Sequence, residues 1–257
     1  MVLWGVSMYN EPKLEEKLYT GLDRLIKYDW SKSNTKRNIL SKDKFDLPIL
    51  PLDLKVDSSV CDKLANTFDT NRDKIHQICT TTWLPDKFDK LTLYGPSIED
   101  YPMLHSATAS CNSWEEIDQK IQGVDLKWWF DLPEFQQFIE TLPFKKIYAV
   151  EFRSIPAGKS TSLHMDREPK TVLSGLRNRL YIPITWNEDS VLACYGIGAV
   201  KIDVGRVYAL NGNGYIHGAR NLHKNKTRHA IIVTGNPWCE EYDSIIESSY
   251  IKYSDWL

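Results

Sequence analysis

The residues best suited to chemistry in this sequence are His164, Asp166 and His217. His164 and Asp166 are two positions apart in a short segment predicted to be a strand, so their side chains project from the same face. His217 follows a turn rich in glycine and asparagine and can supply a third ligand from another strand. Two neutral imidazoles and one carboxylate can form a facial triad on a divalent metal, leaving positions open as in non-haem Fe(II) oxygenases.

The pattern H-x-D is short, and a strand histidine more often packs in a core or lies on the surface. The prediction therefore depends on the segments that surround the three residues. They occur in a fixed order: the turn Ile155-Pro156-Ala157-Gly158 before His164, the segments Arg179–Ile184 and Gly205–Asn211 after Asp166, and Arg228 at the start of an apolar run after His217. An ordered series of this kind is more specific than any of its parts.

From Glu151 to Gly235 this series resembles the 2-oxoglutarate oxygenases of the aspartyl/asparaginyl β-hydroxylase-like group, which includes bacterial free-proline hydroxylases. The resemblance implies a double-stranded β-helix, a cupin-like jelly roll. It implies Fe(II) as the metal, held by the catalytic residues His164, Asp166 and His217, with 2-oxoglutarate and O2 as co-substrates. Because Asp166 is present, the resemblance implies hydroxylation rather than halogenation, with release of succinate and CO2.

The same resemblance assigns co-substrate roles to three further residues. Arg228 would pair with the far carboxylate of 2-oxoglutarate, and its planar guanidinium suits that task. Arg179 and Tyr181 share a strand face, which by resemblance meets 2-oxoglutarate or the substrate. Tyr181 departs from the family, which often has histidine there, and the gap from His217 to Arg228 is about one residue longer than usual, which a bulge could absorb.

The elements that must position these residues change in character near residue 144. Helices are predicted before that point, at 11–28, 58–78, 113–121 and 132–142, with a further helix at 240–248. Strands are predicted after it, at 146–153, 161–165, 179–184, 191–195, 199–203, 207–209, 215–217 and 229–234. Residues 31–46 and 84–102 are predicted to be loops. The expected class is α+β: a mainly helical region, 1–144, that supports or covers a double-stranded β-helix catalytic core, 145–257.

The composition is that of an ordinary globular protein, with 42% hydrophobic and 26% charged residues among 257. A net charge of -2 argues against nucleic acid or an anionic membrane as a partner. Five widely spaced cysteines without a C-x-x-C pair favour a reducing compartment. No secretory signal or membrane span is predicted, so a cytoplasmic protein is expected. The sequence does not set the oligomeric state.

Two alternatives stay open at this stage. A non-redox cupin-like metal-binding module, or a metal-dependent isomerase, could use the same three ligands, but it would not need Arg228. Alternatively, the N-terminal half could have a protein-interaction role, with the barrel as a degenerate scaffold. The presence of all three ligand residues is evidence against degeneracy. The expected partner is an amino-acid, peptide or protein substrate, and the sequence does not choose among them.

Overall fold

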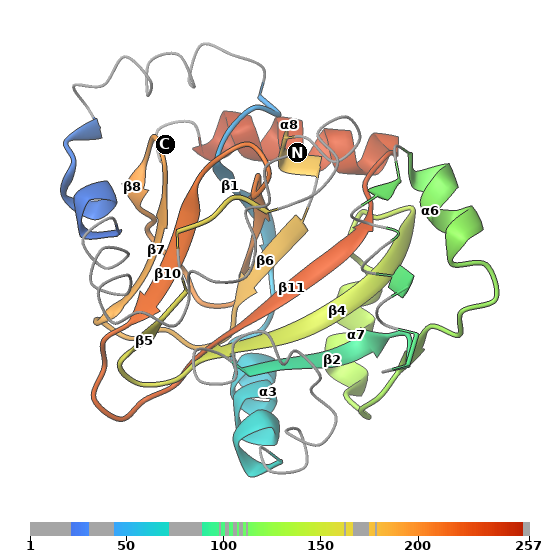
Figure 1. Ribbon diagram of the computed structural model, residues 1–257, viewed down its shortest axis with the longest axis horizontal. Helices are drawn as coiled ribbons and strands as arrows, with labels where there is room; N and C mark the ends of the chain where they lie inside the picture. Colours follow the sequence, from blue (N-terminus) through green and yellow to red (C-terminus); the bar gives the residue numbers. More distant parts are fainter. Residues whose placement is uncertain are drawn as a thin grey trace, which may run out of the picture.

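The computed structural model describes residues 22–30, 44–71, 89–97, 99–100, 103–104, 107, 110–111, 113–161, 163–166, 175–177 and 179–253 (Figure 1). The strands are β1 (Ile49–Lys55), β2 (Asp89–Gly95), β3 (Lys127–Trp128), β4 (Lys146–Ile155), β5 (Lys159–Ser160), β6 (Arg179–Pro183), β7 (Ser190–Cys194), β8 (Gly198–Ala199), β9 (Arg206–Leu210), β10 (His217–Asn221) and β11 (Arg228–Asn236). The helices are α3 (Ser58–Thr70), α6 (Trp114–Lys120), α7 (Pro133–Glu140) and α8 (Glu240–Tyr253), with a 3-10 turn η2 (Gly175–Arg177).

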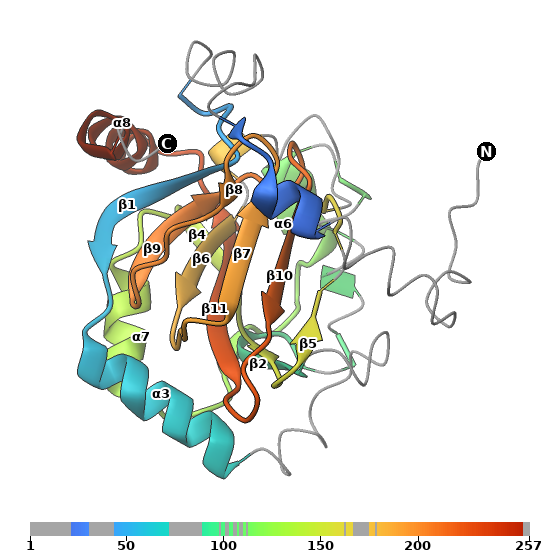
Figure 2. The same ribbon diagram turned by 90° about the vertical axis from the view of Figure 1, so that its left-hand side faces the viewer.

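The strands form two antiparallel sheets, which Figure 2 shows facing each other. The larger sheet has the order β1-β9-β6-β11-β4-β2-β3, and the smaller has the order β5-β10-β7-β8. From β4 onward the chain alternates between them: β4, β6, β9 and β11 lie in the larger sheet, and β5, β7, β8 and β10 lie in the smaller. This winding is the double-stranded β-helix, a form of jelly roll. The predicted core fold is confirmed.

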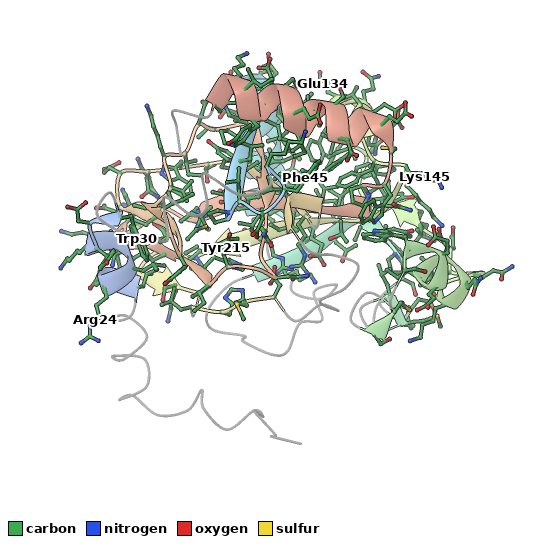
Figure 3. All side chains as sticks on the ribbon, turned by 90° about the horizontal axis from the view of Figure 1, so that it is seen from above. Arg24, Trp30, Phe45, Glu134, Lys145 and Tyr215 are labelled. Carbon is green, nitrogen blue, oxygen red and sulfur yellow. The ribbon has the colours of Figure 1, made fainter. Side chains whose placement is uncertain are left out.

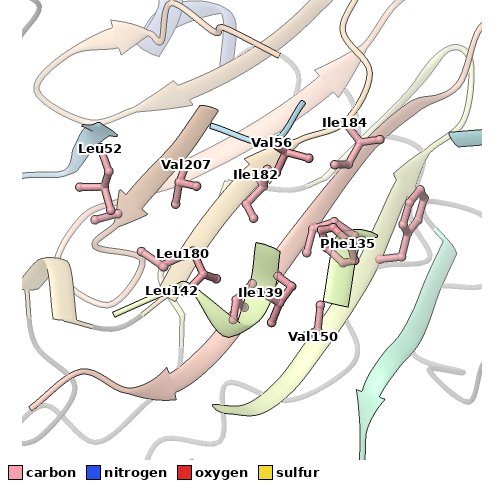
Figure 4. Close-up of a cluster of buried hydrophobic side chains, with 14 of the residues drawn as sticks. Leu52, Val56, Phe135, Ile139, Leu142, Val150, Leu180, Ile182, Ile184 and Val207 are labelled. Carbon is pink, nitrogen blue, oxygen red and sulfur yellow. The ribbon is translucent and has the colours of Figure 1, made fainter. Parts of the chain in front are cut away.

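The larger sheet lies between two apolar layers. Successive residues of a strand point to opposite faces, and these strands carry apolar residues on both faces. Ile231 and Val233 of β11 belong to the main core, on the outer face, together with residues of α3, α7 and α8. Figure 4 shows part of this core, including Phe135 and Ile139 of α7. Ala230 belongs to a second, smaller core on the inner face, with Tyr181 of β6 and residues of β7 and β10. The helices therefore stabilise the sheet from outside, and the space between the two sheets is the place for a site.

The helix boundaries follow the capping signals in the sequence. The Asp57 carboxylate accepts a hydrogen bond from the backbone N–H of Ser59 at 2.8 Å and caps α3. Ser113 caps α6 by accepting from the N–H of Glu116 at 3.1 Å, and Pro133 stands in the first turn of α7. Helix α8 begins as predicted but extends to Tyr253. Of the predicted helices 11–28 and 58–78, residues 11–21 and 72–78 lie outside the described residues.

The N-terminal half is less helical than predicted, because β1, β2 and β3 extend the larger sheet. The loop prediction for 84–102 is wrong over β2. In that strand Leu91 and Leu93 alternate with polar residues and are buried, which is a strand pattern in a lysine- and aspartate-rich context. Residues on both sides of position 144 therefore share one sheet, while the proposed division into two regions stays a prediction.

Three predicted strands of the core are displaced. The predicted strand 161–165 is replaced by β5, which ends at Ser160, and by a single bridge at His164. The predicted strand 199–203 is reduced to β8, and the predicted strand 215–217 starts only at His217 and runs to Asn221. β5 and β8 are two-residue edge strands, which leave few ladder positions for a periodic pattern, whereas β10 lies between β5 and β7. Among the described residues, no helix is long and apolar enough to cross a membrane.

Candidate metal centre

His164, Asp166 and His217 lie together, although the first two are far from the third in sequence. One possible ligand atom from each lies within 4.8 Å of the others, and Nε2 of His164 is 3.7 Å from Oδ1 of Asp166. His217 is buried and Asp166 nearly so, whereas His164 is exposed. Since metal–ligand bonds are about 2.1 Å long, small side-chain rotations would bring all three donors onto one divalent ion. The cluster can therefore hold a metal.

The two histidines are held by an isolated antiparallel bridge between their backbones. The N–H of His164 donates to the carbonyl of His217 at 3.0 Å, and the reverse bond is 2.9 Å long. Their rings lie 4.5 Å apart, centroid to centroid. Nδ1 of His217 is 3.1 Å from the carbonyl of Tyr215, which only accepts, so Nδ1 carries the proton. This tautomer leaves the Nε2 lone pair for a metal.

Asp166 is placed by the Gly/Asn turn that precedes His217. Its N–H donates to the carbonyl of Gly212 at 2.8 Å. Glycine at position 212 leaves room for the carboxylate as it is placed, because a Cβ there would lie 2.0 Å from Oδ2 of Asp166 and 3.2 Å from Cε1 of His217. In the same turn the Asn211 side chain accepts from the N–H of Gly214 at 2.9 Å. The turn therefore shapes the space in which the carboxylate lies.

Residues that precede β1 form hydrogen bonds with this turn. The N–H of Asn211 donates to the carbonyl of Pro48 at 3.0 Å, and the Tyr215 hydroxyl donates to the carbonyl of Asp46 at 2.8 Å. Figure 3 labels Tyr215 and Phe45, which neighbours Asp46. Gly212 and Tyr215 were not predicted to be part of the site. The spacing Asn-Gly-Asn-Gly was the available signal, since it marks a turn whose backbone approaches another group closely.

The electrostatics of the cluster favour metal binding. Burial, with a smaller contribution from the neighbouring His164, lowers the pKa of His217 to about 4, so the imidazole stays neutral near pH 7. For Asp166, burial raises the pKa, but Arg179 and the two imidazoles outweigh that effect and hold the pKa below its ordinary value. A neutral imidazole and an ionised carboxylate are the forms that bind a metal, so neither must lose a proton first.

The side chain of Arg179 forms an ion pair with Asp166, one of the candidate metal ligands. Its Nη1 lies 3.2 Å from Oδ2 of Asp166, while Oδ1 of the same carboxylate faces His164. The ion pair thus fixes the carboxylate plane and directs one oxygen towards the imidazole. This contact was not predicted, because Arg179 and Asp166 come from separate segments. The predicted contact of Arg179 with a co-substrate or substrate stays a prediction.

Arg228 is a buried cation on the inner face, at 3% exposure. It donates through Nη2 to the Tyr181 hydroxyl, and its guanidinium lies 4.4 Å from the ring centroid of Trp186. Its Nε and Nη1 have no hydrogen-bond partner, and no carboxylate of the described residues pairs with it. A buried charge without a counter-ion is costly. This arrangement therefore favours an anion as the missing partner, and Trp186 is a neighbour that sequence analysis missed.

Strand register places Arg228 and the metal centre on one face. Within the larger sheet, Tyr181 pairs with Ile232, Arg179 pairs with Thr234, and Arg228 begins β11 four residues before Ile232. Directly paired residues point to the same side, and so do residues two apart. Arg228 and Tyr181 thus lie on the inner face with Arg179, which reaches Asp166. Tyr181 stands between the buried arginine and the candidate ligands.

A second group of possible metal ligands consists of Glu188, Asp189 and His223. The two carboxylates are exposed. Nδ1 of His223 accepts hydrogen bonds from the backbone N–H groups of Asn225 and Lys226, at 3.1 and 3.0 Å. The neutral ring therefore carries its proton on Nε2 and has no free lone pair, so this group does not fit a metal.

Comparison with known protein families gives no match, and comparison with curated proteins gives none either. Among solved structures, the nickel complex of the non-haem monooxygenase ThoJ is 12% identical, with 78% of each chain covered and a TM-score of 0.42. A prolyl-4-hydroxylase from Pseudomonas putida is 12% identical, with 77% of this chain and 97% of that chain covered and a TM-score of 0.41.

A viral collagen prolyl hydroxylase from Paramecium bursaria Chlorella virus-1, solved with 2-oxoglutarate, is 11% identical; 73% of this chain and 94% of that chain are covered, with a TM-score of 0.39. Similarity at this level carries no conclusion about the present chain. The fold assignment rests on the strand topology, and the function has to be argued from the site.

Proposed function

We propose that this protein is an Fe(II)- and 2-oxoglutarate-dependent dioxygenase that hydroxylates an amino-acid or peptide/protein side chain. One observation carries the proposal. A cluster of two imidazoles and one carboxylate shares the inner face of the barrel with Arg228, a buried cation with two unpartnered nitrogens. A facial triad suits Fe(II), and the buried guanidinium suits a carboxylate. 2-Oxoglutarate needs both, since it binds a metal at one end and carries a free carboxylate at the other.

His164, Asp166 and His217 would hold the metal, and Arg228 would hold the far carboxylate of 2-oxoglutarate. The bound metal and co-substrate would supply hydroxylation by O2, coupled to decarboxylation of 2-oxoglutarate to succinate and CO2. The roles of the chain itself are binding and orientation. Arg179 keeps the Asp166 carboxylate turned towards His164, and the carbonyl of Tyr215 keeps the His217 proton on Nδ1.

Arg228 and Tyr181 form the binding group for the co-substrate carboxylate. The Tyr181 hydroxyl accepts from Nη2 of Arg228, so its own proton can be donated to a carboxylate beside the arginine. Burial raises the pKa of Tyr181, so the hydroxyl keeps that proton near neutral pH. The surrounding inner core includes Leu192 and Ala230, and it excludes water around the ion pair. Exclusion of water strengthens such a charge-assisted interaction.

The competing proposal is a non-redox metal-binding module or a metal-dependent isomerase. Such a protein would use the three ligands and the ion pair between Arg179 and Asp166. It would leave the burial of Arg228 without a counter-ion unexplained. The arginine therefore favours the oxygenase over this alternative.

Calorimetry under anaerobic conditions tests the proposal. 2-Oxoglutarate is titrated into the protein with and without Mn(II), a substitute for Fe(II) that avoids oxidation. We expect binding that tightens when the metal is present, because one end of the ligand chelates it. The competing proposal predicts metal binding with no 2-oxoglutarate binding, and that result would overturn ours.

A further inference from the structure

A second set of charges lies on the inner face, beside the metal centre. It consists of Lys90 on β2 and Glu151 and Arg153 on β4, and we call it the inner charged group. Lys90 pairs in register with Arg153, and Ile232 pairs with both Glu151 and Tyr181. Directly paired residues share a face of the sheet. The group therefore faces the space between the sheets and not the helix-covered core.

Glu151 joins the two cations. Its Oε2 accepts a hydrogen bond from Nη2 of Arg153 at 2.7 Å, and its Oε1 pairs with Nζ of Lys90. Lys90 and Glu151 are buried, at 8% and 5% exposure, whereas the side chain of Arg153 is 29% exposed. Arg153 is thus the member of the group that a molecule entering from solvent can reach, and Glu151 fixes its orientation.

The inner charged group lies near the metal centre on the same face of the sheet. Glu151 and Tyr181 both pair with Ile232, and Arg179, two residues before Tyr181, reaches Asp166 at 3.2 Å. The pKa of Lys90 is lowered to about 8, mainly by burial and also by the positive charges of Arg153 and Arg179, although Glu151 opposes this shift. Lys90, Arg153 and Arg179 thus place three cations near one another on this face.

An ion pair that served only the fold would be a costly choice at this position. Buried charges seldom stabilise a protein more than apolar residues of similar size. Neighbouring positions on the same face hold apolar residues, such as Ala230 and Ile232 of β11. Buried ion pairs beside a candidate metal centre are more typical of binding sites.

We propose that Arg153, oriented by Glu151 and supported by Lys90, determines specificity by binding a carboxylate of the substrate beside the metal centre. This inference rests on the proposed function, since it assumes a substrate at that centre. A guanidinium binds a carboxylate through two parallel hydrogen bonds, which would fix the substrate in both position and angle. The carboxylate could be the α-carboxylate of a free amino acid or the side chain of an acidic residue in a peptide.

The test measures binding without turnover. The protein is saturated with Mn(II) and 2-oxoglutarate without O2, and the paramagnetic ion relaxes the protons of any probe bound near it. One pair of probes is L-leucine and L-leucinamide, which differ at the α-carboxylate. The other is acetyl-Gly-Asp-Gly-amide and acetyl-Gly-Asn-Gly-amide, which differ at the side chain. The two pairs distinguish the two sources of the carboxylate.

We expect the acid of at least one pair to be relaxed more strongly than its amide. Arg153→Gln should weaken its binding by about tenfold or more, as expected when a charge-assisted hydrogen bond is lost. Arg153→Lys keeps the charge and should retain part of the preference, which also covers the case in which Arg153→Gln fails to fold. Lys55→Gln is the matched control, because Lys55 pairs with Asp203 at an exposed position.

The inference is overturned if no acid is relaxed, if amides are relaxed equally, or if Arg153→Gln keeps the wild-type preference. Binding of Mn(II) and 2-oxoglutarate is measured first, without any probe. If it fails, the proposed function fails and this inference with it. If it succeeds and no preference for acids appears, only the inference about Arg153 is wrong.

Discussion

Gly212 lies so close to Asp166 that the carboxylate of this candidate metal ligand keeps its position only because glycine has no side chain. A Cβ at position 212 would lie 2.0 Å from Oδ2 of Asp166 and 2.9 Å from its Cγ. The carboxylate occupies the space that any other residue at this position would fill. The clash involves the end of a side chain, so the backbone could stay in place while the carboxylate rotates away.

Gly212→Ala should therefore reduce metal affinity while leaving the fold intact. We expect at least about a tenfold loss of Mn(II) affinity, in the range seen when the surroundings of a metal ligand are changed. The loss would be measured by calorimetry and the fold by circular dichroism. Gly214→Ala is the control, because its Cβ would meet the side chain of Asn211, which is not a ligand. Equal metal affinity in Gly212→Ala and the wild type would contradict the described placement of Asp166.

Because His217 is buried, we expect the free energy of unfolding of the metal-free protein to fall in acid. Its pKa is about 4 in the folded protein, below the ordinary value of 6.5. As pH falls below 6.5, the unfolded chain takes up a proton that the folded protein does not, so stability is lost until the pH reaches about 4. This single group should contribute about 3 kcal/mol to that loss.

Urea unfolding of metal-free protein between pH 7 and pH 4 measures this effect. His217→Gln lacks the titrating group, so its free energy of unfolding should fall less over the same interval. The difference between the two proteins isolates His217 from the other acidic groups. Parallel curves for wild type and variant would show that the ring titrates normally and is not buried as described.

Arg179 predicts how metal binding responds to pH. It is the main favourable influence on the low pKa of Asp166, with Nη1 3.2 Å from Oδ2. Arg179→Gln removes that charge, so the pKa of Asp166 should rise and protons should compete with the metal at higher pH. We expect the variant to lose more Mn(II) affinity at pH 5 than at pH 7. Arg206→Gln is the control, since Arg206 pairs with Asp203 and not with a ligand. Equal losses at both pH values would assign Arg179 a different role.

Replacing Arg228 should weaken co-substrate binding without lowering the stability of the protein. Arg228→Met should weaken 2-oxoglutarate binding by about a hundredfold, because a buried charge pair loses one partner. It should leave the melting temperature unchanged or raise it, because a buried cation without a counter-ion is removed. Calorimetry and thermal unfolding measure the two effects.

Arg206→Met provides the contrast to Arg228→Met. Arg206 is paired with Asp203 at 3.0 Å and donates to the Tyr253 hydroxyl at 2.7 Å. Its replacement should lower the melting temperature and leave 2-oxoglutarate affinity unchanged. A destabilised Arg228→Met variant that still binds 2-oxoglutarate would mean that Arg228 has only a structural role.

The sequence predicted the parts of the fold that depend on local signals. Long strands such as β4 and β11 contain runs of apolar residues and are mostly buried, and the helix starts at Asp57 and Ser113 carry capping residues. It missed β2, whose two buried leucines are separated by a polar residue inside a charged segment. It also misplaced short edge strands, whose ends are set by pairing with distant segments.

In the candidate site too, local features were predictable and contacts between distant segments were not. His164 and Asp166 lie together as predicted, but without the expected strand: His164 forms a single bridge, and Asp166 is held by the carbonyl of Gly212. The turn before His217 was visible in its glycines and asparagines. The contact between Arg179 and Asp166 and the cation–π contact between Arg228 and Trp186 were not predictable, because each joins side chains from separate segments. Local patterns identify residue types, whereas the contacts among them depend on the sheet pairing.

The central claim is that one site binds both Fe(II) and 2-oxoglutarate. The most direct test is the visible absorption spectrum of anaerobic protein titrated with Fe(II) and then 2-oxoglutarate. A weak charge-transfer band should appear only when both are present. The band should be absent in His164→Ala, and it should require much more 2-oxoglutarate in Arg228→Met. Metal binding without such a band at any 2-oxoglutarate concentration would contradict the account and favour a non-redox metal-binding protein.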